Sequence, residues 1–132
     1  MEILLEIGNS RFANTGGKLE IITMDCIFCK IINKEVPSEV VYEDDKIIAF
    51  KDINPKAPVH FLIVPKKHIV SVNHLEMQDK AIMADLVFVA QKISREKNLK
   101  GYKLVINVGS DGGQAIDHLH LHLLSGKPTE LP

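Results

Sequence analysis

Three histidines alternate with leucines near the end of this 132-residue chain, and no other feature limits the local structure as strongly. They are His118, His120 and His122. Successive side chains of a β-strand point to opposite faces, so a strand here would turn all three imidazoles to one side and the leucines to the core. Neighbouring histidines would then be about 6.5–7 Å apart in Cα position. We predict a strand over Leu119–Leu124 that carries a row of histidines.

The rest of the chain predicts an α+β fold. From Gln78 to Lys97, apolar residues recur at steps of three and four, as they do on the buried face of a helix. Short apolar runs bounded by charged residues, proline or glycine predict strands. The other predicted elements are a short helix at 27–33 and strands at 40–42, 47–50, 60–64 and 102–108. We expect a mainly antiparallel sheet of about five strands with one long and one short helix.

The first 24 residues differ in character from the rest of the chain. A short apolar stretch gives way to loops rich in glycine, and Met24 would serve as a start codon just before the denser pattern begins. We interpret residues 1–24 as an extension of unknown role with one or two short strands, and residues 25–132 as the main domain.

Composition excludes several classes of function. A 45% hydrophobic share excludes disorder throughout the chain, and a formal charge of -1 gives no support to nucleic-acid or membrane-surface binding. No apolar run approaches the roughly 20 residues of a membrane-spanning helix, and no secretory signal is evident. We therefore expect a cytoplasmic protein. Cys26 and Cys29 lie too close together to suggest a disulfide framework and favour a metal or redox pair.

The histidine row has three interpretations. It can be the polar face of an amphipathic strand, a metal site, or a catalytic site in which a neutral imidazole attacks phosphorus. The turn from Asn107 to Gln114 contains three glycines, which let the backbone approach a ligand and its N–H groups converge on an anion. This neighbouring turn favours phosphorus chemistry.

Several motifs together resemble the histidine triad (HIT) family, and within it the Hint branch of purine nucleoside phosphoramidases. These motifs are HLHLHLL at 118–124, SDGGQ at 110–114, DINPKAPVH at 52–60, IVPKKH at 63–68 and CIFCKI at 26–31. The resemblance covers about residues 25–126. It implies the HIT-like fold and a homodimer in which the long helix and the 102–108 strand pack against their two-fold mates.

The resemblance also implies roles for individual residues. His120 is the expected nucleophile, which takes a nucleoside monophosphate from a phosphoramidate and is then freed by water. The flanking catalytic residues would be His118, His122 and His60. The expected substrate-binding residues are Asp52 at the ribose, Asn107 near the sugar and phosphate, Gly113 and Gln114 at the α-phosphate, and Ile53. Ala115 stands where many relatives carry a serine, and Val108 replaces a common acidic residue, which leaves rate and amine specificity open.

The cysteine pair has a matching expectation. Part of the family binds zinc through two cysteines and two histidines, which correspond here to Cys26, Cys29, His68 and His118. Such a closed set of four ligands would make zinc structural, and the chemistry would need no cofactor. His74, the remaining histidine, is expected on the surface.

The function implied is hydrolysis of purine nucleoside 5′-phosphoramidates, with AMP or GMP as the product. A dinucleoside polyphosphate hydrolase is the alternative within the family. A nucleotide-binding module with weak or lost catalysis, and a zinc-binding interaction domain, are alternatives of other classes.

Overall fold

The computed structural model describes residues 4–7, 10–15, 18–23 and 26–127. By its internal contacts the chain divides into two compact units, residues 1–37 and 38–132. The first contains strands β1 (Leu4–Ile7), β2 (Ser10–Thr15) and β3 (Lys18–Thr23), paired antiparallel in that order. The expectation of one or two short strands in this region was wrong, because the chain folds back twice into a three-stranded meander.

Helix α1 (Ile27–Ile32) follows these strands and matches the predicted short helix. Phe28, Cys29 and Ile31 are buried, so one side of this short helix is apolar. Asn33 caps the helix, and Lys34 takes a left-handed conformation with φ 64° that ends it.

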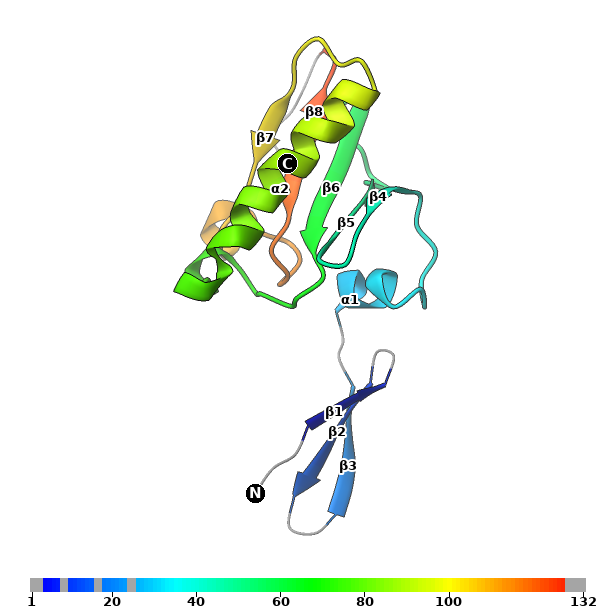
Figure 1. Ribbon diagram of the computed structural model, residues 1–132, viewed down its shortest axis with the longest axis vertical. Coiled ribbons are helices and arrows are strands. Elements are labelled where there is room, and N and C mark those ends of the chain that lie inside the picture. The colour runs from blue at the N-terminus through cyan, green and yellow to red at the C-terminus, as the bar shows by residue number, and fades with distance from the viewer. Residues whose placement is uncertain (1–3, 8–9, 16–17, 24–25, 128–132) are drawn as a thin grey trace. The chain divides into compact units, whose positions relative to one another are not determined.

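The second unit is built on a five-stranded antiparallel sheet, as the sequence predicts (Figure 1). Its strands lie side by side in the order β4-β5-β6-β8-β7. Their bounds are β4 Val40–Glu43, β5 Ile47–Lys51, β6 Val59–Pro65, β7 Lys103–Val105 and β8 Leu121–Ser125. Three short 3₁₀ helices lie in the connections, at η1 Val72–His74, η2 Met77–Asp79 and η3 Ser110–Gly112.

The long helix α2 (Lys80–Glu96) packs across one face of this sheet (Figure 1). Its buried side chains include Leu86, Ala90 and Ile93, which recur at steps of three and four as predicted. The predicted helix began at Gln78, but Met77–Asp79 form a 3₁₀ turn closed by a capping box. The sequence pattern therefore located α2 to within a few residues at each end.

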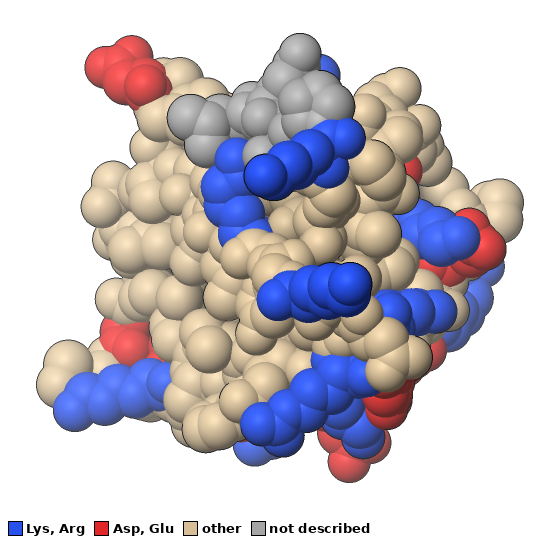
Figure 2. Space-filling view, turned by 90° about the horizontal axis from the view of Figure 1, so that it is seen from above, with Lys and Arg blue, Asp and Glu red and all other residues tan. Residues whose placement is uncertain are grey.

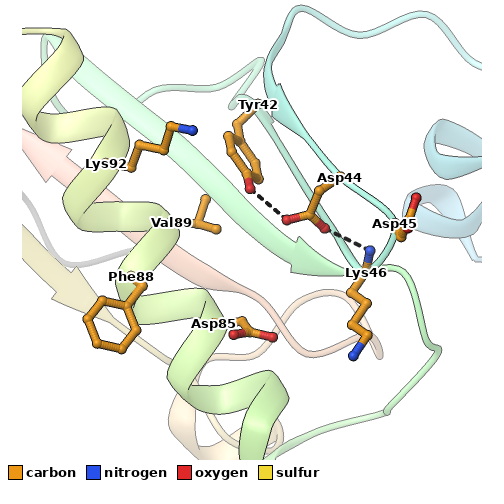
Figure 3. A pocket seen from close by; sticks show the side chains of 8 residues that line it. All are labelled: Tyr42, Asp44, Asp45, Lys46, Asp85, Phe88, Val89 and Lys92. Atoms are coloured by element: carbon orange, nitrogen blue, oxygen red, sulfur yellow. Dashed lines mark hydrogen bonds between the residues drawn. The ribbon is translucent and has the colours of Figure 1, made fainter.

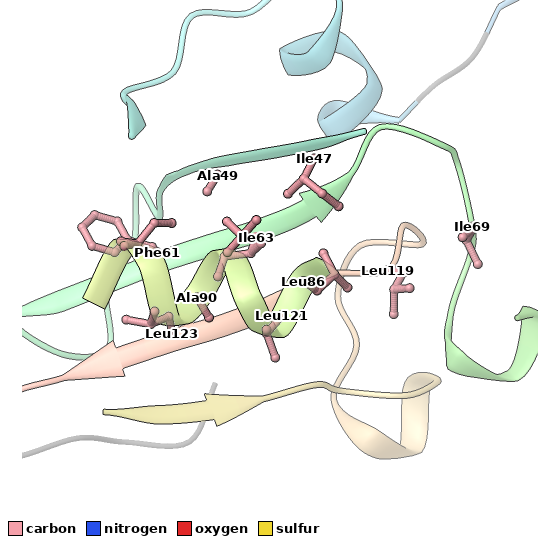
Figure 4. Packing of buried hydrophobic residues seen from close by; sticks show 12 residues of the cluster. Ile47, Ala49, Phe61, Ile63, Ile69, Leu86, Ala90, Leu119, Leu121 and Leu123 are labelled. Atoms are coloured by element: carbon pink, nitrogen blue, oxygen red, sulfur yellow. The ribbon is translucent and has the colours of Figure 1, made fainter. Parts of the chain in front are cut away.

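The core lies between α2 and the sheet (Figure 4). Every other residue of β8 and of the segment before it, Leu119, Leu121 and Leu123, belongs to this core, as predicted. They pack against alternate residues of β6, Phe61 and Ile63. Because side chains alternate along a strand, the histidines between these leucines lie on the other face of the sheet.

Charge is distributed unevenly over the surface. Figure 2 shows Lys and Arg side chains spread over the face seen from above the view of Figure 1, with Asp and Glu mainly toward its rim. The near-zero net charge therefore conceals a face with a local excess of positive charge.

Candidate active site

Three histidines of the predicted row are buried, but only His122 lies within a regular strand. His118, His120 and His122 are 0%, 6% and 7% exposed. The predicted strand began at Leu119, whereas β8 begins at Leu121. The Leu119 N–H bonds instead to the carbonyl of Ile69. Because His118 and His120 precede the sheet pairing, their rings take separate partners, and the expected single row divides into two groups.

A main-chain bond at one ring nitrogen fixes the tautomer of His120. Its Nδ1 lies 2.7 Å from the carbonyl oxygen of His118. A carbonyl oxygen can only accept, so Nδ1 carries the proton and Nε2 carries a lone pair in the neutral ring. Burial lowers the pKa of His120, although the bond to His118 and the charge of Asp52 act in the opposite direction. The side chain is therefore a neutral imidazole near pH 7 with a nucleophilic Nε2.

His60 and His122 form a hydrogen-bonded pair across strands β6 and β8. His60 faces Leu124 in the register, which makes His122 its diagonal neighbour on the same face. His60 Nε2 and His122 Nδ1 are 2.9 Å apart. The ring centroids of His120 and His122 are 4.8 Å apart, so this pair lies directly beside the predicted nucleophile.

Main-chain bonding decides which nitrogens of this pair carry protons. The Lys56 N–H donates to His60 Nδ1 at 3.0 Å, so that nitrogen has the lone pair. His60 Nε2 then carries the proton and donates to His122 Nδ1, which leaves the proton of His122 on Nε2. Burial is the main cause that lowers the pKa of both rings, to about 3 for His122. Both imidazoles are therefore neutral near pH 7.

His118 belongs to a different group. Its Nε2 lies 2.8 Å from the carbonyl oxygen of Pro65 and must donate to it, so Nδ1 has the lone pair. That nitrogen lies 3.0 Å from Nδ1 of His68. Burial lowers the pKa of His118 to about 4. A neutral ring held by a main-chain carbonyl, with a lone pair on its other nitrogen, is the usual form of a histidine metal ligand.

The four predicted zinc ligands lie close to one another. One ligand atom from each of Cys26, Cys29, His68 and His118 can be chosen so that all four lie within 4.8 Å of one another. The two cysteines form no disulfide. Two thiolates and two imidazoles are a donor set that zinc prefers, so this cluster can hold a metal such as zinc.

A second cluster of potential ligands is less suited to a metal. Asp52, His60 and His122 also offer ligand atoms within 4.8 Å of one another. However, the Lys56 N–H requires the lone pair of His60 on Nδ1, so the Nε2 atom that faces the other two carries a proton. We interpret this cluster as a hydrogen-bonded relay.

Two of the expected substrate-binding residues, Asp52 and Ile53, follow the end of β5. Asp52 follows the strand, and its Oδ2 is 3.5 Å from His60 Nε2 while its Oδ1 accepts the N–H of Asn54. Ile53 beside it is 89% exposed. An exposed apolar side chain next to a carboxylate is an arrangement that can contact a nucleoside.

Most of the hydrogen bonds that the glycine turn forms join groups within the turn. Gly109 and Gly113 have positive φ angles of 69° and 83°, which favour glycine. The N–H groups of residues 112, 113 and 114 bond to carbonyls within the turn, and the Gly109 N–H donates to Gln114 Oε1. These four N–H groups therefore do not converge on an anion, contrary to the expectation from the sequence. The glycines instead allow the backbone conformation of this tight turn.

Asn107 and Gln114 hold this turn in place. Asn107 Nδ2 donates to the Gly112 carbonyl at 2.8 Å. Gln114 Nε2 donates to the carbonyls of Val70 and Ile116, at 2.6 and 2.9 Å. The Gln114 side chain thus ties the turn to the segment after β6.

A separate hollow of about 390 Å³ lies between the β4–β5 hairpin and α2 (Figure 3). Two of its charged side chains, Asp44 and Lys92, contact Tyr42. Asp44 accepts from the hydroxyl of Tyr42 at 2.6 Å, and Nζ of Lys92 lies 5.3 Å from the centre of the Tyr42 ring. The lining residues are Tyr42, Asp44, Asp45, Lys46, Asp85, Phe88, Val89 and Lys92. None of the histidines that the structure describes lines this hollow, so it is distinct from the candidate active site.

Sequence reasoning missed the main-chain groups that orient the imidazoles. These are the N–H of Lys56 and the carbonyls of Pro65 and His118. Every residue offers a carbonyl and nearly every residue an N–H, so no side-chain pattern marks them. The two prolines on either side of Lys56 were the one signal of a rigid loop at this point.

The chain matches known proteins over most of its length. The family model described as "Scavenger mRNA decapping enzyme C-term binding" matches residues 25–130. An HIT-like protein of Buchnera aphidicola is 48% identical over 103 residues, which cover 76% of this chain and 90% of the relative. The chain belongs to the histidine triad (HIT) family. The predicted family is thus confirmed, while these relatives do not distinguish its Hint branch.

Solved HIT structures share the fold. The crystal structure of a HIT family hydrolase from Legionella pneumophila is 46% identical, with a TM-score of 0.77, and the match covers 82% of this chain and 98% of that one. A HIT family hydrolase from Clostridium thermocellum is 43% identical, with a TM-score of 0.78 and coverage of 84% and 98%. The α+β HIT fold is therefore confirmed.

Among the described residues, no helix combines the length and apolar character needed to cross a bilayer. The cytoplasmic location of this HIT protein stays a prediction.

The buried neutral histidines predict acid sensitivity. The native pKa of His122, about 3, lies below its ordinary value of 6.5, so the unfolded chain binds more protons between these values. The contribution of His122 to the free energy of unfolding should therefore be fully present above pH 6.5, and it should decrease as the pH falls toward 3. Urea unfolding at several pH values would measure this slope.

A variant pair assigns the slope to its source. His122→Gln should reduce the slope between pH 6.5 and 4.5, because it removes one group that protonates on unfolding. Met77→Gln, at a residue that is 75% exposed and carries no titrating group, should leave the slope unchanged. Equal slopes in His122→Gln and the unaltered protein would contradict the assignment.

Proposed function

We propose that this HIT protein is a nucleotide hydrolase that cleaves the P–N bond of purine nucleoside 5′-phosphoramidates through a covalent nucleotidyl-histidine. The observation that carries the proposal is the protonation of His120. Its Nδ1–H is held by the His118 carbonyl, so the neutral ring offers a lone pair on Nε2. A metal ligand would also need such a lone pair, but His120 is absent from both clusters of potential ligands among the described residues.

In the first step, Nε2 of His120 attacks the α-phosphorus and the P–N bond breaks. The leaving nitrogen takes up one proton from solution and departs as an amine, while the nucleotide stays bonded to Nε2 of the imidazole. The His118 carbonyl continues to accept the Nδ1–H, which stabilises the positive charge that develops on the ring. His118 thus assists with its main chain.

His122 supplies a hydrogen bond to the phosphoryl group. Its Nε2 carries a proton because Nδ1 accepts from His60. A neutral donor in a buried site stabilises negative charge that builds on phosphoryl oxygens. In the second step, water attacks the phosphorus, returns a proton to solution and releases the nucleoside monophosphate, so the proton taken up earlier is recovered.

The loop after β5 is the proposed nucleoside site. The Asp52 carboxylate is placed beside His60 and can accept from ribose hydroxyls, and the exposed Ile53 can cover a face of the purine. We keep Asn107 and Gly113 on the phosphate side from the family resemblance alone, because Asn107 Nδ2 and the Gly113 N–H bond to carbonyls of the turn. Because the side chain of Gln114 bonds to backbone carbonyls, we assign it the positioning of the 109–114 turn.

The competing functions make different demands on the same site. A dinucleoside polyphosphate hydrolase would use the same nucleophile with a nucleotide as the leaving group. A nucleotide-binding module would need no nucleophilic nitrogen on His120. The defined protonation of His120 and His122 favours an enzyme. Ala115 stands where many relatives carry a serine, so the expected site lacks only that one hydroxyl.

His120→Ala should lower kcat for adenosine 5′-phosphoramidate by at least about a thousandfold, because it removes the nucleophile. Mass spectrometry of enzyme quenched during turnover should find an AMP adduct on His120 in the unaltered protein. His74→Ala is the matched control and should turn over normally. Unchanged kcat in His120→Ala would contradict the mechanism, and hydrolysis of dinucleoside polyphosphates alone would favour the alternative.

We further propose that Cys26, Cys29, His68 and His118 hold a structural zinc ion. The fit rests on His118, whose Nε2–H donates to Pro65 and leaves a lone pair on Nδ1 beside His68. When zinc is bound, four protein ligands would close its coordination and leave no position for substrate. The reaction itself would need no cofactor.

Cys29→Ser should abolish stoichiometric zinc and lower the melting temperature, because metal binding that requires the folded state stabilises it. Zinc content by elemental analysis and thermal unfolding would measure both effects. His74→Ala, a histidine outside the set, should retain one zinc ion per chain. Full zinc content in Cys29→Ser would refute this ligand set.

We also propose a homodimer that is formed through β7 and α2. In the order of the sheet β7 is an edge strand, and Leu104 on it is 36% exposed. A strand at the edge of a sheet, beside exposed apolar side chains, favours pairing with a second copy. The neighbouring Tyr102 and, on α2, Val87 and Phe88 are also exposed.

Leu104→Lys should shift the protein from dimer to monomer in sedimentation velocity, because it places a charge in the proposed interface. Met77→Lys changes an equally apolar residue that is 75% exposed in η2, and it should leave the dimer intact. A monomeric unaltered protein would contradict the proposal, as would a dimeric Leu104→Lys.

A further inference from the structure

We propose that the main-chain N–H of Lys56 is a positioning group for the reaction, acting through His60 to keep a proton on Nε2 of His122. This inference rests on the proposed function, since it concerns the residue that we assign to the phosphoryl group. Lys56 itself touches neither the nucleophile nor the expected substrate position. Its effect is transmitted through two hydrogen bonds.

The two bonds form a directed chain. The Lys56 N–H lies 3.0 Å from His60 Nδ1 and can only donate. His60 is 4% exposed, so no bulk water competes for that nitrogen. The opposite nitrogen of His60 is 2.9 Å from His122 Nδ1. A neutral imidazole has one N–H, so accepting at Nδ1 obliges His60 to donate from Nε2.

The same two rings have a second arrangement in the absence of this N–H. His60 would carry its proton on Nδ1, and His122 would donate from Nδ1 to the lone pair on Nε2 of His60. The distance between the rings would not change, but Nε2 of His122 would then have a lone pair and no proton. It could not donate to a phosphoryl oxygen and would repel it instead. The Lys56 N–H therefore selects the productive one of two protonation patterns.

Asp52 favours the same pattern from the other side of His60. Its Oδ2 is 3.5 Å from His60 Nε2, and a carboxylate beside that nitrogen favours a proton on it. The donor at Nδ1 and the acceptor near Nε2 thus both favour the form of His60 that is protonated on Nε2. The arrangement of His60 is determined at both nitrogens.

The loop that carries Lys56 is held at both ends. The Asp52 N–H bonds to the His60 carbonyl at 3.0 Å, and Asp52 Oδ1 caps the N–H of Asn54. Prolines at 55 and 58 restrict the backbone on either side of Lys56. At Gly126, which has φ 94°, a Cβ atom would lie 2.8 Å from the Pro58 ring. Such close packing keeps the Lys56 N–H aimed at His60.

The test compares two substitutions at one position. Lys56→Pro removes the N–H, and Lys56→Ala loses the same side chain but keeps the N–H. We expect kcat for adenosine 5′-phosphoramidate to be at least about tenfold lower in Lys56→Pro than in Lys56→Ala, from the loss of one buried hydrogen bond and the reversal of His122. KM should change much less, because the ribose and base contacts remain.

Nitrogen-15 NMR of the histidine rings gives a readout that a merely structural role would not move. In the substrate-free protein, Lys56→Ala should show His122 protonated on Nε2, and Lys56→Pro should show a population protonated on Nδ1. If Lys56→Pro fails to fold, an amide-to-ester replacement at Lys56 removes the same N–H without a proline. The matched ester at Ala57, whose N–H is outside the relay, should behave as the unaltered protein.

The outcomes separate this inference from the proposed function. A shifted proton on His122 together with the loss in kcat supports the inference. An unshifted proton overturns it, and so does a shifted proton with equal kcat in the two variants. If neither the unaltered protein nor Lys56→Ala hydrolyses the phosphoramidate, the proposed function fails, while the NMR comparison still decides whether Lys56 controls the rings.

Discussion

The site depends on main-chain groups that decide which nitrogen of each buried imidazole carries a proton. A carbonyl holds the Nδ1–H of His120, another holds the Nε2–H of His118, and an amide faces Nδ1 of His60. Burial lowers the pKa of all these rings, so each carries a single ring proton near pH 7. Desolvation and backbone geometry together turn chemically identical side chains into groups with different roles.

The sheet makes these bonds possible. β6 and β8 pair so that His60 and His122 become diagonal neighbours, and the leucines between the histidines anchor β8 to the core beneath α2. The core and the site are therefore opposite faces of the same strands. A one-residue slip in the register of β8 would turn the histidines toward the helix and the leucines toward the site.

Much of this could be predicted from the sequence. The period of α2, the core position of Leu119 and the places of the strands along the chain are apolar patterns that the structure preserves. The strand predicted at 102–108 shrinks to Lys103–Val105, because Val105 is the last residue opposite β8 and the chain then leaves for the glycine turn. The resemblance already implied that His118 joins the cysteines. The ring nitrogen that carries the proton in each histidine could not be predicted, since it depends on main-chain carbonyls and amides that no side-chain pattern marks.

His118 combines two contributions that have different chemical origins. Its imidazole belongs to the cluster with the cysteines, whereas its carbonyl orients His120. Any amino acid at this position would still provide the carbonyl. The cysteine cluster therefore depends on the imidazole of His118, whereas the orientation of His120 depends on the main chain of His118.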